Sequence, residues 1–69
     1  MEAYTVPLTT YLARAGRALS GVSAGEIAGA AGLAADQVQR FEHGDASVLT
    51  DAENHKLRSV LEEFGVVFF

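Results

Sequence analysis

Apolar residues recur at spacings of three and four along most of this chain, which is the period of an α-helix. This pattern predicts four helices separated by glycines or short polar loops. In the first segment, LTTYLARAGRALSG, the predicted inward face consists of Leu8, Leu12, Ala15 and Leu19. We expect Thr9 to cap the start of this helix and Gly21 to end it, because threonine oxygens cap helix starts and glycine tolerates the left-handed turn at helix ends.

Two shorter helices are predicted on either side of Gly32. Ser23 and Glu26 have the spacing of a capping box, in which each side chain satisfies a free backbone N–H group at the start of a helix. The first of these two helices should end at Gly32 and the second at Gly44. The apolar residues expected to hold the two helices together are Ile27, Leu33, Val38 and Phe41.

A fourth helix is predicted after a second capping box, formed by Thr50 and Glu53. Gly65 should end it, and its expected inward residues are Leu57, Val60, Leu61 and Phe64. Residues 4–6 and the final VVFF segment are rich in β-branched and aromatic residues, so a short strand is an option at each end. The expected fold is therefore a small four-helix all-α domain, with short terminal β-strands as an option, that comprises residues 1–69 as one unit.

Composition narrows the function classes. The chain has 69 residues, no cysteine and two histidines, so we expect no metal site and no other cofactor. No apolar run reaches the length of about 18 residues that a membrane span needs, and we expect a cytoplasmic protein with no membrane partner. The net charge of −4 argues against non-specific attraction to nucleic acid. Asp51 and Glu53 have no nucleophile or metal partner, so we do not expect an enzyme.

The segment of residues 23–44 has the features of a helix-turn-helix unit, with small residues where two helices cross and a glycine at the turn. The longer stretch RALSGVSAGEIAGAAGLAADQVQRFEHG resembles the phage-repressor and Cro-like (Xre-type) helix-turn-helix family. The positions that match the family pattern are Arg17, Gly21, Ser23, Glu26, Ile27, Ala28, Ala31, Gly32, Leu33, Val38, Phe41, Glu42 and Gly44.

The resemblance implies a lambda-repressor-like fold and a sequence-specific DNA-binding transcription regulator. It implies a repressor that acts as a homodimer on double-stranded DNA and inserts the second helix of the unit into the major groove. The residues that this assigns to base reading are Ala35, Asp36 and Arg40, with Gln37 and Gln39 beside them. The residues that it assigns to phosphate contact are Ser23, Ala24 and His43.

Several of these residues have a structural alternative. The resemblance favours an internal salt bridge between Arg17 and Glu42 over a phosphate contact by Arg17. Asp36 is an acid in a first helical turn, where the helix dipole alone favours it. Arg40 and the two glutamines are either groove contacts or solvated surface, and His43 either covers a helix end or binds phosphate.

Departures from the family pattern favour a second function. Ala24 replaces a glutamine that usually anchors a phosphate, and Ala34 replaces a usual serine or threonine cap. Few basic residues are available to neutralise DNA phosphates, and phosphate neutralisation dominates DNA affinity. The alternative is therefore a protein-interaction module of the same shape with little DNA affinity, which binds a regulator, a toxin or a polymerase subunit.

The VVFF ending is the expected dimer interface, because a bare apolar strand edge invites pairing and a small core needs extra burial. The residues concerned are Val66, Val67, Phe68 and Phe69. The alternative is that this segment packs on its own core and pairs with residues 4–6.

Overall fold

The structure is a computed structural model that describes residues 8–66. The elements in this range are α1 (Thr10–Ser20), α2 (Ala24–Ala31), α3 (Ala35–Glu42), a short 3-10 helix, η1 (Ala46–Val48), and α4 (Asp51–Glu63). Between residues 8 and 66 there is no strand, so the expected four-helix all-α fold is confirmed. The strands considered for residues 4–6 and for the last residues fall outside the described part, apart from Val66.

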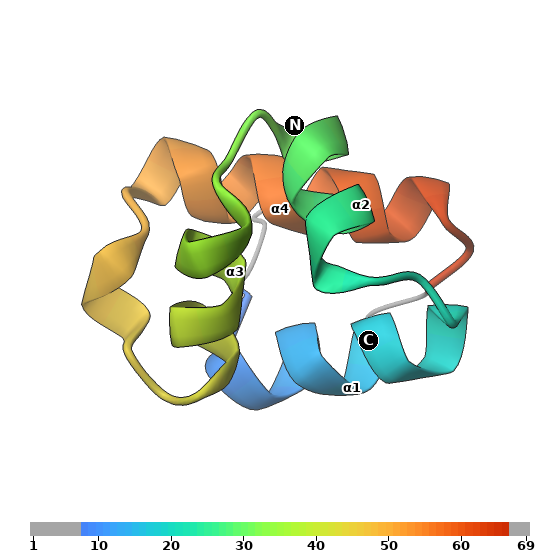
Figure 1. Cartoon of the computed structure of the whole chain (residues 1–69), viewed down its shortest axis with the longest axis horizontal. Helices are drawn as coiled ribbons and strands as arrows, with labels where there is room; N and C mark the ends of the chain where they lie inside the picture. Colours follow the sequence, from blue (N-terminus) through green and yellow to red (C-terminus); the bar gives the residue numbers. More distant parts are fainter. Residues whose placement is uncertain (1–7, 67–69) are drawn as a thin grey trace, which may run out of the picture.

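The two longest helices form the frame of the domain. α1 and α4 run along opposite sides of the view in Figure 1, with α3 between them and α2 crossing in front of α4. No helix within residues 8–66 has the length and hydropathy needed to cross a bilayer.

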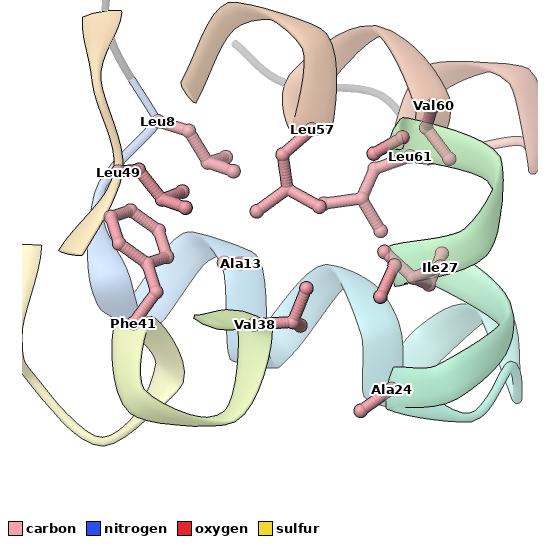
Figure 2. Close-up of a cluster of buried hydrophobic side chains, with 12 residues drawn as sticks. Leu8, Ala13, Ala24, Ile27, Val38, Phe41, Leu49, Leu57, Val60 and Leu61 are labelled. Atoms are coloured by element: carbon pink, nitrogen blue, oxygen red, sulfur yellow. The ribbon is translucent and has the colours of Figure 1, made fainter. Parts of the chain in front are cut away.

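The core is built where all four helices meet. Its largest fully buried side chains come from α2, α3 and α4: Phe41, Ile27, Leu57, Leu61 and Val38. Figure 2 shows them with Leu8, Ala13 and Leu49 in one cluster. The predicted contact between α2 and α3 is confirmed for Ile27, Val38 and Phe41, while Leu33 is half-buried against this cluster.

The helix ends follow the local sequence closely. Thr9 Oγ1 accepts a hydrogen bond from the Leu12 backbone at 3.2 Å, and both predicted capping boxes form at the starts of α2 and α4. Gly21 and Gly32 both have φ of 72°, a left-handed conformation that glycine adopts without steric cost. These predictions are confirmed, and they fix where α1 and α2 end.

The predicted inward face of α1 is wrong at Leu12, Ala15 and Leu19. Ala13 and Gly16 are the buried residues of this helix. Ala15 is exposed, and Leu12 and Leu19 keep 41% and 83% of their surface accessible. Small side chains on the inner side let α1 lie close to the core, and this leaves the larger leucines outside.

Phe64 was also predicted to face inward, and it is 45% exposed. α4 ends at Glu63, so Phe64 is the residue after the last turn rather than a member of its buried face. The inward positions Leu57, Val60 and Leu61 are confirmed as buried.

A polar contact joins the segment before α1 to α4. The backbone N–H of Leu8 donates to Asn54 Oδ1 at 2.8 Å, and Asn54 Nδ2 donates to the Leu8 carbonyl at 2.8 Å. Leu8 itself is buried, as predicted, although it precedes the helix. The amide of Asn54 thus satisfies both backbone groups of a residue in the core.

Candidate nucleic-acid interface

α3 has one buried and one exposed face. Val38, Phe41 and Glu42 point into the domain. The exposed residues of the helix are Ala35, Asp36, Gln39 and Arg40. An exposed helix with polar side chains in consecutive turns has the shape of an element that enters a DNA major groove.

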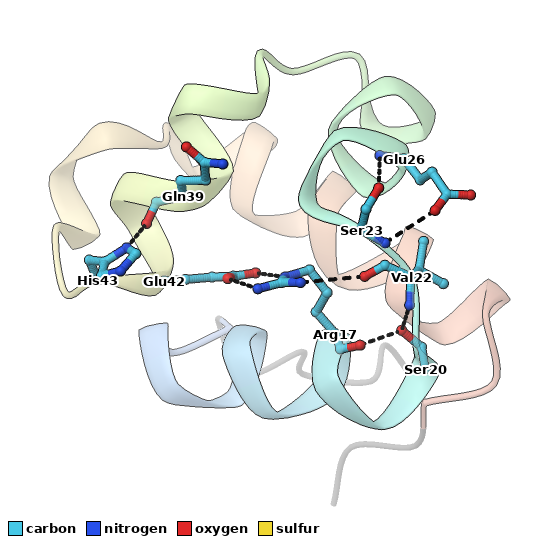
Figure 3. Close-up of polar contacts among 8 residues, drawn as sticks. All are labelled: Arg17, Ser20, Val22, Ser23, Glu26, Gln39, Glu42 and His43. Carbon is cyan, nitrogen blue, oxygen red and sulfur yellow. Dashed lines mark hydrogen bonds and ion pairs between the residues drawn. The ribbon is translucent and has the colours of Figure 1, made fainter.

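The buried end of α3 is attached to α1 by an ion pair. Arg17 Nε donates to Glu42 Oε2 at 2.7 Å and Arg17 Nη2 donates to Oε1 at 2.8 Å, so the contact is bidentate. Figure 3 shows the guanidinium lying between Glu42 and the Val22 carbonyl, to which Nη1 donates at 3.5 Å. The hydrogen bond to Glu42 raises the pKa of Arg17 above its ordinary value. The predicted internal salt bridge is present, and Arg17 is occupied by it.

Arg40 lies near one acid on the exposed face. Its Nη1 is 3.5 Å from Asp36 Oδ2, one turn earlier, and both side chains are more than half exposed. An exposed pair of this kind contributes roughly 0–1 kcal/mol, because water screens it. A guanine edge could therefore replace Asp36 as the partner of Arg40 at little cost.

Gln37 has a role within its own helix. Its Oε1 accepts a hydrogen bond from the Ala34 backbone at 2.9 Å. Ala34 has no side-chain oxygen to return the contact, so α3 starts with half of a capping box. The Gln37 side chain is half-buried and is the least accessible of the polar residues assigned to base reading.

The start of α2 is closed by its capping box. Ser23 Oγ accepts from the Glu26 backbone at 3.1 Å, and Glu26 Oε1 accepts from the Ser23 backbone at 3.2 Å. Ser23 is exposed, whereas Ala24 is buried in the core. The Ala24 side chain is therefore not on the surface that would meet a phosphate.

His43 covers the end of α3. Its Nδ1 lies 2.7 Å from the Gln39 carbonyl oxygen, which can only accept, so Nδ1 is the donor (Figure 3). The ring is exposed, and Nε2 is the nitrogen that could meet an external ligand. Just beyond, Asp45 accepts from Ser47, and this hydrogen bond lowers the pKa of Asp45, with a smaller effect of Arg40.

The assigned residues thus divide into three groups. Those on the accessible side of α3 are Ala35, Asp36, Gln39, Arg40 and His43. Ser23 is exposed at the start of α2, and Ala24 and Gln37 are partly or wholly committed to the domain itself. Val66, assigned to a dimer interface, is half-buried against the core, and Val67, Phe68 and Phe69 lie outside the described residues.

Sequence reasoning did not foresee two features. One is the Asn54 contact, for which the sequence contains no local signal, and the other is the exposure of the apolar residues on α1. The comparisons add no relative to this picture: no family model, curated protein or solved structure matches this chain.

Proposed function

We propose that this chain is a sequence-specific DNA-binding transcription regulator of the Xre type, a repressor that acts in the cytoplasm as a dimer. In this proposal α3 enters the major groove of double-stranded DNA. The observation that carries it is the exposed face of α3, where Asp36, Gln39 and Arg40 are accessible. The opposite side of the helix is held by Val38, Phe41 and the Arg17–Glu42 pair.

Arg40 is the residue on which sequence reading depends. An arginine can donate two hydrogen bonds to the O6 and N7 atoms of guanine, and a good bidentate contact discriminates between bases by about 1–3 kcal/mol. Gln39 could contact an adjacent base from the same face. Asp36 could accept from cytosine once Arg40 has turned away from it.

The charge around this face predicts modest affinity. Glu26 and Asp36 are exposed acids near the proposed DNA surface, and Arg40 is the one arginine in residues 23–44 of the sequence. Because phosphate neutralisation provides most non-specific affinity, binding should depend on two copies acting together.

A gel-shift series tests this proposal, using duplexes selected from a random-sequence pool by the protein itself. We expect retardation that weakens as salt rises. Arg40→Ala should weaken binding to the selected sequence by about tenfold or more. The salt dependence of DNA binding should change little in this variant, because a contact to a base, unlike a contact to a phosphate, releases no counterions. The matched control, Lys56→Ala, removes the same charge from an exposed position on α4 and should bind nearly as well as the original protein.

If the original protein does not retard DNA at low salt although circular dichroism shows that it is folded, DNA binding is contradicted. Equal losses in the two variants would show that only overall charge matters. The second result would contradict sequence-specific binding, and the first result would favour the second candidate, a protein-interaction module that binds a regulator, a toxin or a polymerase subunit. The net charge of −4 and the buried Ala24 are the observations that favour it.

A further inference from the structure

α1 presents an apolar face to solvent. Four large hydrophobic side chains are exposed in the described part of the chain, and three belong to this helix: Tyr11, Leu12 and Leu19. Tyr11 is 69% exposed, and Ala15 and Ala18 lie on the same accessible side. We call the surface of Tyr11, Leu12, Ala15, Ala18 and Leu19 the outer face of α1.

The outer face of α1 has little charge beside it. The inner side of the helix is covered by the core through Ala13 and Gly16, and the only charged residues of the helix are Arg14 and Arg17. Arg17 is occupied by Glu42, so Arg14 is the single charge beside the outer face. Large apolar side chains that are exposed together on one face of a helix mark a surface that binds a partner.

The fourth exposed hydrophobic residue of the described part lies outside α1. Phe64 follows the last turn of α4. Figures 1 and 3 both place the C-terminal end of α4 beside the C-terminal end of α1. The exposed Phe64 follows α4 at this end of the molecule.

The spacing of the outer face fits a helix like itself. Leu12, Ala15 and Leu19 are three and four residues apart, the spacing of a coiled-coil seam. Leu12 precedes Ala15 by three residues and Leu19 follows it by four. In an antiparallel pair centred on Ala15, each Leu12 would meet the partner's Leu19, and the small Ala15 would let the two helices approach closely.

We propose that the outer face of α1 docks a second copy of this chain, with the two α1 helices antiparallel across a two-fold axis near Ala15. With Arg14 beside it and no acid on α1, the outer face has too little charge to select DNA, an anionic membrane or an acidic peptide. A second copy needs no opposite charge and supplies the same leucines in reverse order. Such a dimer does not depend on DNA binding, since a protein-interaction module would have the same exposed apolar face on α1 to bury.

The size of the surface sets the strength of the dimer. An 11-residue helix is about 16 Å long, so one helix pair buries less than the roughly 800 Å² per partner of a standard interface. An area of roughly 800 Å² would be a large share of the 4424 Å² of surface that this small chain exposes. The contact therefore belongs at the lower end of specific interfaces, and the dimer should form in a concentration-dependent way.

Analytical ultracentrifugation across micromolar to millimolar concentrations tests this proposal. We expect the original protein to pass from monomer to dimer. Leu19→Glu should weaken the dimer by tenfold or more, because a carboxylate would be buried against the partner's leucine. The matched control, Ala52→Glu, adds the same charge at an exposed position on α4 and should dimerise like the original protein. Circular dichroism checks that both variants are folded.

Salt separates this proposal from DNA binding. Each copy has a charge of −4 and the interface is apolar, so added salt should strengthen the dimer, whereas it weakens a complex with DNA. Arg40→Ala should weaken binding to the selected DNA sequence by about tenfold or more and leave the dimer intact. Failure of one proposal is thus visible without failure of the other.

Three results would overturn the α1 dimer. The first is a monomer at all concentrations, and the second is a dimer that Leu19→Glu leaves unchanged. The third concerns the chain's own last residues, which follow closely after α4. If deletion of residues 67–69 turned a monomer into a dimer, those residues would be the occupant of the outer face.

Discussion

Glu42 is the one charged residue among residues 8–66 that is buried, and Arg17 is its partner. We expect Arg17→Met to lower the free energy of unfolding by about 3 kcal/mol, because the carboxylate would stay buried without a compensating charge. This is a large part of the stability of a domain that has roughly 5 kcal/mol in total. Urea denaturation monitored by circular dichroism measures the change.

Two further variants show whether the buried charge is the cause. Arg40→Met removes an exposed arginine and should change stability by less than about 1 kcal/mol. The double variant Arg17→Met with Glu42→Leu removes both charges and should be more stable than Arg17→Met alone. A double variant that is no more stable than Arg17→Met alone would contradict this account.

At the scale of the helices, the sequence predicts what depends on neighbouring residues. The capping boxes and the ends at Gly21 and Gly32 form as expected, because each involves residues within one turn. The orientation of α1 could not be predicted, since one helical spacing joins Leu12 to Ala15 and an equivalent one joins Ala13 to Gly16. Which face is buried depends on how closely α3 and α4 approach, and hydrophobicity alone favours the leucines.

The missing cap of α3 gives a prediction at this scale. Ala34 has φ and ψ of −80° and 146°, the extended conformation of a capping residue. Ala34→Ser should raise the free energy of unfolding by about 1 kcal/mol, because the hydroxyl can accept from a free N–H group of the first turn. Ala35→Ser, the same change one residue later, lies inside the helix and should not stabilise. Equal urea midpoints for the two variants would show that the cap does not form.

Across the whole molecule, contacts between distant segments decide how the helices assemble. Such contacts are the hardest to predict from the sequence. The resemblance places Arg17 opposite Glu42, 25 residues away, so this pair could be predicted. Nothing comparable identifies Asn54, which contacts Leu8 across 46 residues. The candidate site divides in the same way: the exposure of Asp36 and Arg40 follows from helical spacing, whereas the burial of Ala24 depends on the packing of the complete domain.

The contact between Asn54 and Leu8 supports a prediction about the domain as a unit. Asn54→Ala removes two hydrogen bonds and leaves both backbone groups of a buried residue without these partners, so we expect a loss of roughly 2 kcal/mol. The exposed neighbour His55 is the control, and His55→Ala should change stability by less than about 0.5 kcal/mol. In Asn54→Ala the amide hydrogen of Leu8 should also exchange with solvent much faster, because it has lost its acceptor. If the two variants unfold at the same urea concentration, the segment before α1 is held by the apolar side chain of Leu8 alone, and the amide of Asn54 contributes nothing to joining the first helix to the last.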